Sequence, residues 1–198
     1  MTATDAGEAG SGVEALAREL LERRAAPDHW QGRLSSSALS TATAVLALEL
    51  AVRNGVRHGE HLGAIVGAGV AWLLQHQNAD GGWGDSVRSR SNVSTTSIAW
   101  ATLSTLESRG HGTATAVERA AAWLRREAGD VTPEALRAAI LRRYGRDRTF
   151  SVPILTVLAL TNKLGGEAAG WRSLPQLPFE LAALPHAWFQ HLRLPVVS

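Results

Sequence analysis

Residues 69–84 read "GVAWLLQHQNADGGWG", an apolar run that passes into a polar, glycine-rich segment and closes on a tryptophan. The run is typical of the end of an amphipathic helix, and the glycines let the chain reverse direction without a steric penalty. We expect the Gln77 amide to satisfy unpaired backbone groups at the end of the neighbouring helix, and the Trp83 ring to lie over the loop. The stretch therefore predicts a mechanical link between one helical layer and the next.

Further helices are predicted on both sides of this stretch. One segment starts at Thr113 and stops at Gly129, and another starts at Thr132, with Pro133 in its first turn, and stops at Gly145. Threonine caps and terminal glycines are typical helix boundaries. The apolar stripe that leads into the loop consists of Leu62, Val66, Val70 and Leu73. Strand-like alternation is nowhere sustained, so we expect an all-α fold.

Three segments that open helices are similar to one another: LSTATAVLAL, VSTTSIAWAT and FSVPILTVLAL. Their serines, Ser40, Ser94 and Ser151, recur at a spacing of roughly fifty to sixty residues, which suits one helical hairpin per repeat. The hydroxyl residues from Ser94 to Thr96 are small, and in the first turn of a helix they allow a close approach of its neighbours. The sequence therefore predicts stacked helical hairpins.

The composition is that of a folded protein. Of the 198 residues, 45% are hydrophobic and 19% are charged, which suits a globular domain. No stretch is apolar for long enough to predict a membrane-spanning helix. Residues 1–11 are small and polar and lack the apolar centre of a secretory signal, so we expect a flexible tail there and one domain over residues 12–198. The expected location is the cytoplasm or the periphery of the cytoplasmic membrane.

The residue content also argues against several kinds of site. The chain has no cysteine, which excludes disulfides, thiolate nucleophiles and cysteine-ligated zinc. The histidines show no metal-ligand spacing, so we expect neither a metal nor a cofactor. The densest basic stretch consists of Arg142, Arg143, Arg146 and Arg148. It lacks interleaved aromatics, so we interpret it as a solvated helix end and expect no nucleic acid partner.

The stretch at residues 69–84 resembles the QW motif of the squalene-hopene cyclase and oxidosqualene cyclase family. The matching residues are Trp72, Leu73, Gln77, Gly81 and Trp83. Two further stretches, HWQGRLSSSALSTATAVLAL and TFSVPILTVLALTNKLGG, are similar to the N-terminal half of a bacterial squalene-hopene cyclase in order and spacing. A second QW-like segment, AAAWLRREAGD, keeps Trp123 but lacks the glutamine and the closing tryptophan. The resemblance covers residues 12–198.

The resemblance implies a partial α/α toroid, a barrel of helical hairpins as in terpenoid cyclases and prenyltransferases. It also implies an apolar, squalene-like isoprenoid substrate and intramolecular polyene cyclisation in polycyclic triterpene (hopanoid-type) biosynthesis. Members of the family start cyclisation with an acid from an Asp-x-Asp-Asp motif. None of the six aspartates of this chain lies within two residues of another. We therefore expect no catalytic residue in this chain and no activity from the chain alone.

Three points stay open at the level of sequence. The repeats supply little more than half of a closed toroid, which favours a fragment of a longer cyclase-like protein or a subunit that needs a partner. The alternative function is a non-enzymatic α/α domain that binds an isoprenoid or a protein partner. The apolar C-terminal stretch, SLPQLPFELAALPHAWFQHLRLPVVS, meets either the rest of such a protein or a membrane surface. Its Glu180 and His186 are candidate acids, but local capping or pairing explains them better.

Overall fold

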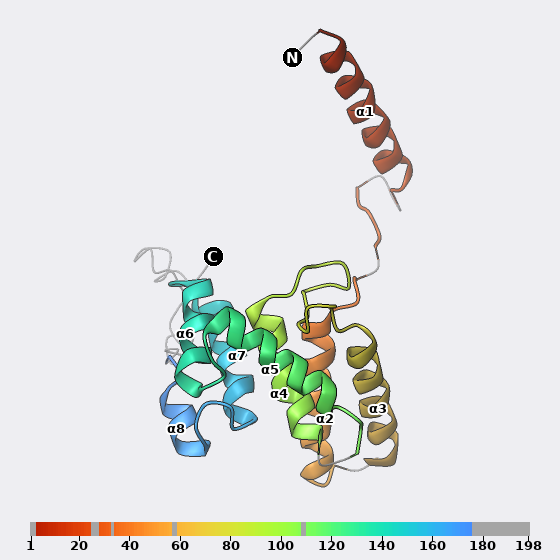
Figure 1. Ribbon diagram of the computed structural model, residues 1–198. Helices are drawn as coiled ribbons and strands as arrows, with labels where there is room; N and C mark the ends of the chain where they lie inside the picture. Colours follow the sequence, from red (N-terminus) through yellow and green to blue (C-terminus); the bar gives the residue numbers. More distant parts are fainter. Residues whose placement is uncertain (1–2, 25–27, 33, 57–58, 108–109, 176–198) are drawn as a thin grey trace, which may run out of the picture. The chain divides into compact units, whose positions relative to one another are not determined.

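The computed structural model (Figure 1) describes residues 3–24, 28–32, 34–56, 59–107 and 110–175. Contacts divide the chain into two units, Met1–Ser35 and Ser36–Ser198. Over the described ranges the chain forms eight helices and no strand, which confirms the all-α prediction. No helix in this part of the chain is both long enough and apolar enough to cross a membrane.

The first unit contains helix α1 (Ala3–Glu22). This differs from the flexible tail expected over residues 1–11, and the boundary between the units follows Ser35 instead of residue 11. Alanine is the strongest helix former, and each residue added to an existing helix gains a hydrogen bond, so the amphipathic segment around Leu16 extends toward the N-terminus. The described side chains of α1 are exposed, and Leu16 is 67% exposed.

The second unit is built from two rows of helices. Its helices are α2 (Ala38–Arg53), α3 (Gly59–Gln75), α4 (Val93–Leu106), α5 (Ala114–Ala128), α6 (Pro133–Tyr144), α7 (Arg148–Leu160) and α8 (Glu167–Arg172). Helix α4 packs against both α2 and α7, so these three helices form one row. In the other row, α3 packs on α2, α5 on α4, and α6 on α5 and α7 (Figure 1). The three similar segments with Ser40, Ser94 and Ser151 all lie in the first row.

Helix α4 forms the centre of the core. Every residue from Ser94 to Leu103 is buried, and the Thr102 hydroxyl donates to the carbonyl oxygen of Ala42 in α2 at 3.3 Å. Small hydroxyl residues allow this burial because their side chains are short, and most of them find a hydrogen-bond partner, such as the Asp85 carboxylate for Thr95, whereas Ser97 Oγ has none. The predicted stripe of α3 also lies in the core, with Val66, Val70 and Leu73 buried and Leu62 half-buried.

The predicted helix boundaries are confirmed, with one difference in chemistry. Helix α6 begins after Thr132, whose side chain caps its first turn, and ends at Gly145. Helix α5 ends at Gly129, where a φ of 89° favours glycine. Thr113 precedes α5 but makes no capping hydrogen bond. Its hydroxyl donates instead to the carbonyl oxygen of Leu103 at 3.2 Å, so this threonine joins α5 to α4.

Candidate functional site

Residues 76–92 connect α3 to α4, and we refer to them as the α3–α4 loop. Gln77 lies near its start and donates two hydrogen bonds from Nε2. One reaches the carbonyl oxygen of Gly81 within the loop at 2.8 Å, and the other reaches the carbonyl oxygen of Ala116 in α5 at 2.9 Å. We expected this partner to be an unpaired backbone group at the end of the neighbouring helix. The observed partner is instead the Ala116 carbonyl, which lies in the first turn of α5. Gln77 therefore holds the loop to α5.

Trp83 is buried, with 1% of its surface exposed. Its indole Nε1 donates to the carbonyl oxygen of Leu73 in α3 at 3.0 Å, and its backbone N–H donates to Thr96 Oγ1 in α4 at 2.9 Å. We expected the ring to lie over the loop. In the structure it is buried, which is favourable for a large aromatic surface once its N–H has a partner. Trp83 therefore joins α3 to α4.

The other residues of the QW-like stretch lie at the end of α3 and in the loop. Leu73 is fully buried, whereas Trp72 is half-buried and stacks on His76 with 4.1 Å between ring centroids. Gly81 has a φ of 96°, and a Cβ added to it would lie 2.7 Å from the carbonyl oxygen of Arg119. A side chain at this position would meet the backbone of α5, so the loop lies directly against that helix.

Two arginines of α5 complete the attachment of the loop. The Arg119 guanidinium donates to Gln77 Oε1 at 3.0 Å and to the carbonyl oxygens of Asn78 and Ala79 at 3.0 and 3.1 Å. Arg126 donates to the carbonyl oxygen of Asp80 at 2.9 Å. Sequence reasoning did not find these contacts, because they join residues 40 to 46 positions apart.

Asp80 is a second contact point that sequence reasoning missed. Its Oδ1 accepts hydrogen bonds from the Gly82 N–H at 3.0 Å and the Ser91 hydroxyl at 2.7 Å, and its Oδ2 accepts one from Trp123 Nε1 at 3.0 Å. The one available signal was Trp123 itself, the tryptophan kept in the otherwise degenerate second QW-like segment.

These contacts also set the charge of Asp80. Slight burial alone raises the pKa of the Asp80 carboxyl, but the hydrogen bonds from Gly82, Ser91 and Trp123 and the charge of Arg126 outweigh it and lower that pKa. Donors that bind the ionised form favour it. Asp80 is therefore a carboxylate at neutral pH with no proton to give. It braces the loop and does not act as a general acid.

The remaining candidates lie either outside the described residues or on the surface. Glu180, His186 and nearly all of the apolar C-terminal stretch lie outside the described residues. The arginine-rich stretch is exposed, as expected of a solvated helix end: Arg142, Arg143, Arg146 and Arg148. Over the described ranges, no group of three or more His, Asp or Glu side chains is arranged to hold a metal ion.

Comparison with known proteins identifies the family. The family model for the squalene-hopene cyclase C-terminal domain matches residues 5–135, which is well over half of the chain. The chain belongs to the squalene-hopene cyclase family. No curated protein and no solved structure matches it. The helices of the second unit are a partial α/α toroid of this family.

The match also bears on which half of a squalene-hopene cyclase the chain resembles. The matched model describes the C-terminal domain, whereas the sequence resemblance pointed to the N-terminal half, so the family is confirmed and the assignment to the N-terminal half is not supported. Helical hairpin repeats resemble one another. A signature of a few residues in one hairpin therefore identifies the family without identifying the half.

Proposed function

We propose that this chain forms part of a polyene cyclase, in which it supplies helical scaffold and part of the cavity wall. The reaction is intramolecular cyclisation of a squalene-like isoprenoid, as in polycyclic triterpene (hopanoid-type) biosynthesis. Membership of the squalene-hopene cyclase family supports this reaction class. The main support for the scaffold role is the attachment of the α3–α4 loop, where Gln77 and Trp83 join α3, α4 and α5.

A cavity wall for cation chemistry has to keep its aromatic groups in fixed positions, because electrostatic stabilisation depends on preorganised groups. Helix α4 offers such a group in Trp100, which is 7% exposed. The Lys163 ammonium lies over its ring, 4.4 Å from the centroid. This contact supports the proposal because it shows a buried indole face of this fold next to a positive charge.

The initiating acid has to come from outside these residues. The 198 residues contain no Asp-x-Asp-Asp sequence, and the hydrogen bonds that lower the pKa of Asp80 keep this aspartate ionised at neutral pH. A general acid for an alkene needs a protonated carboxyl group in the cavity. We therefore expect the chain alone not to cyclise squalene.

The test is a complementation assay. The purified chain is incubated with squalene in detergent, alone and together with a squalene-hopene cyclase domain that carries the Asp-x-Asp-Asp motif, and products are identified by gas chromatography and mass spectrometry. We expect the mixture to give more cyclised product than that domain gives by itself. The double variant with Gln77→Ala and Trp83→Ala should lose the gain, and Gln75→Ala, at an exposed position, should keep it. Cyclised product from the chain alone, or no gain on mixing, would contradict the proposal.

The alternative is a non-enzymatic α/α domain that binds an isoprenoid or a protein partner. Exposed apolar side chains favour it. In the described part of the second unit they include Val56, Ile65, Phe150, Leu160 and Trp171, each more than 40% exposed. Saturable quenching of tryptophan fluorescence by squalene, without any gain of product in the mixture, would favour this alternative.

A further inference from the structure

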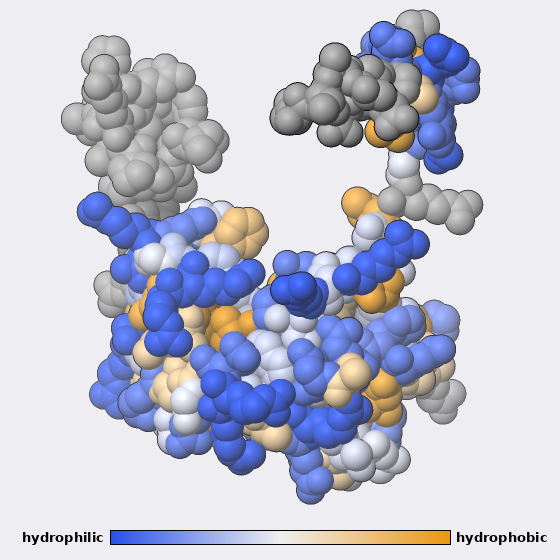
Figure 2. Space-filling view, turned by 45° about the horizontal axis from the view of Figure 1, so that its top comes forward, coloured by the Kyte–Doolittle hydropathy of each residue, from blue (hydrophilic) through white to orange (hydrophobic). Residues whose placement is uncertain are grey.

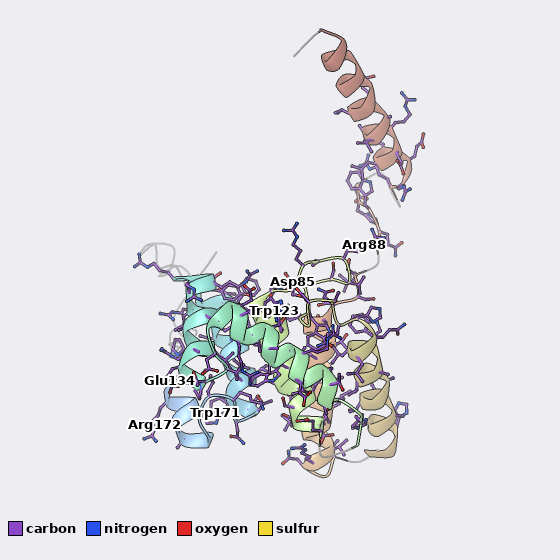
Figure 3. All side chains as sticks on the ribbon, in the orientation of Figure 1. Asp85, Arg88, Trp123, Glu134, Trp171 and Arg172 are labelled. Atoms are coloured by element: carbon purple, nitrogen blue, oxygen red, sulfur yellow. The ribbon has the colours of Figure 1, made fainter. Side chains whose placement is uncertain are left out.

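Two open hollows meet beside Trp123. The first, of about 520 Å³, lies between the α3–α4 loop and α5, and the second, of about 430 Å³, lies between that loop, α5 and α6. Ser91, Trp123 and Glu127 line both hollows, so the two form one groove. Figure 3 shows Trp123 on α5 beside the loop that carries Asp85 and Arg88.

Arginines line this groove from two elements. Arg88 and Arg90 come from the loop, and Arg142 and Arg143 come from α6. All four are exposed, and within the described ranges no carboxylate pairs with them. In Figure 2, hydrophilic side chains cover most of the face that this view presents. The four guanidinium groups are therefore not held in an ion pair. That of Arg143 lies over the Tyr144 ring, 5.9 Å from its centroid, and a guanidinium over a ring keeps its in-plane N–H donors for a ligand.

The carboxylates of the groove do not balance this charge. Asp80 already accepts hydrogen bonds from Gly82, Ser91 and Trp123. Glu127 is the other acidic residue that lines the groove. Four arginines against these two carboxylates leave an excess of positive charge, and fields add where charges of one sign line a concave surface.

We propose that this groove binds an organic phosphate or diphosphate through Arg88, Arg90, Arg142 and Arg143. The planar guanidinium fork matches phosphoryl oxygens in a bidentate geometry, and such charge-assisted hydrogen bonds are about twice as strong as neutral ones. Val87, Val93 and Trp123 add apolar surface to the lining, which suits an anion carried on an organic group. This site does not depend on the proposed cyclisation, because none of the four arginines contributes to the attachment of the loop.

The test uses inorganic pyrophosphate as the probe and the full chain at physiological ionic strength. Binding is measured by isothermal titration calorimetry and by the fluorescence of the tryptophans. Two double variants, Arg88→Gln with Arg90→Gln and Arg142→Gln with Arg143→Gln, should each weaken binding about tenfold or more, since each removes two charge-assisted contacts. The control, Arg125→Gln with Arg148→Gln, removes the same charge at exposed positions outside the groove and should leave binding unchanged.

A second arm separates a free phosphate from a lipid headgroup. Cosedimentation with vesicles that contain phosphatidic acid should show the same dependence on the groove arginines if the phosphoryl group belongs to a lipid. An equal loss in the control and the groove variants would mean attraction by net charge alone and would overturn the site. Failure of the wild-type chain to bind in both arms would also overturn it. Melting temperatures of all variants should match that of the wild type, because these side chains are exposed.

Discussion

The Gln77 side chain donates to the carbonyl oxygen of Ala116 at 2.9 Å, across 39 positions of sequence. Replacement of Gln77 by alanine would leave this carbonyl and that of Gly81 without the donor, so we expect a loss of about 1 to 3 kcal/mol in the free energy of unfolding. Urea denaturation followed by circular dichroism measures it. Gln75→Ala removes the same amide from an exposed position and should change stability by less than about 0.5 kcal/mol. Equal effects of the two variants would contradict the role of Gln77.

The indole of Trp83 provides a second test of the loop. Phenylalanine keeps an aromatic ring but cannot donate to the carbonyl oxygen of Leu73, so Trp83→Phe should lower the free energy of unfolding by about 1 to 3 kcal/mol. Trp83→Ala also leaves a cavity and should lower it by about 3 to 5 kcal/mol. Trp171→Phe is the control, because Trp171 is 46% exposed. A Trp83→Phe protein as stable as this control would show that the hydrogen bond is not needed.

Gly81 separates backbone strain from steric contact. Alanine at Gly81 and alanine at Gly129 both adopt a positive φ, near 96° and 89°, but only at Gly81 does the added Cβ meet another residue, the carbonyl oxygen of Arg119. Both variants therefore have the backbone strain of a positive φ, and only Gly81→Ala also has the contact with Arg119. This contact should make Gly81→Ala less stable than Gly129→Ala by about 1 to 3 kcal/mol. Thermal melting of the two variants under one condition measures the difference. Equal melting temperatures would show that the loop can move away from α5.

Asp80 makes the stability of the loop depend on pH. Its pKa is lowered in the folded protein, so its contribution is complete above the unfolded pKa of about 3.9 and is lost as the pH falls through the lower folded pKa. The stability difference between the wild type and Asp80→Asn should therefore be largest near neutral pH and should shrink in acid. Asp130→Asn alters a carboxylate that accepts one hydrogen bond, from the Val131 N–H, and should give a smaller difference. A pH-independent difference for Asp80→Asn would refute the assignment.

Local signals in the sequence predicted the helices well. The Thr132 cap and the glycines at the ends of α5 and α6 act within a few residues, and the apolar stripe of α3 follows from its periodicity. Local signals could not give the contacts that join helices. Thr113 was expected to cap α5, but its backbone is helical instead of extended and its hydroxyl donates to the carbonyl of Leu103, a contact that exists only after α4 and α5 have packed together.

The same reasoning explains what was missed in the loop. Gln77 and Trp83 stood out because they are unusual residues in a glycine-rich turn. Arg119 and Arg126 did not, since arginines on an amphipathic helix are typical of a solvated face. Their role depends on carbonyl groups that the folded loop turns toward α5. The groove arginines are a similar case, because Arg88 and Arg142 share one groove only in the folded chain.

Lys163 is the single lysine of the chain, so its titration can be followed without overlap from other lysines. Burial lowers the pKa of its ammonium, and the nearby charge of Glu107 opposes this shift without cancelling it. The unfolded pKa of a lysine is about 10.4. Between the lower folded pKa and this value the unfolded chain holds the proton more often than the folded chain, so the folded state becomes more favourable as the pH rises through this range. Reductive methylation with a carbon-13 label gives one lysine signal, whose NMR titration should show a pKa below that of an exposed lysine.

Two variants test the role of Glu107. Glu107→Gln removes the opposing charge and should lower the pKa of Lys163 further, whereas Glu118→Gln, on an exposed face of α5, should leave that pKa unchanged. A Lys163 pKa that is unchanged in Glu107→Gln would show that the carboxylate does not act on this lysine.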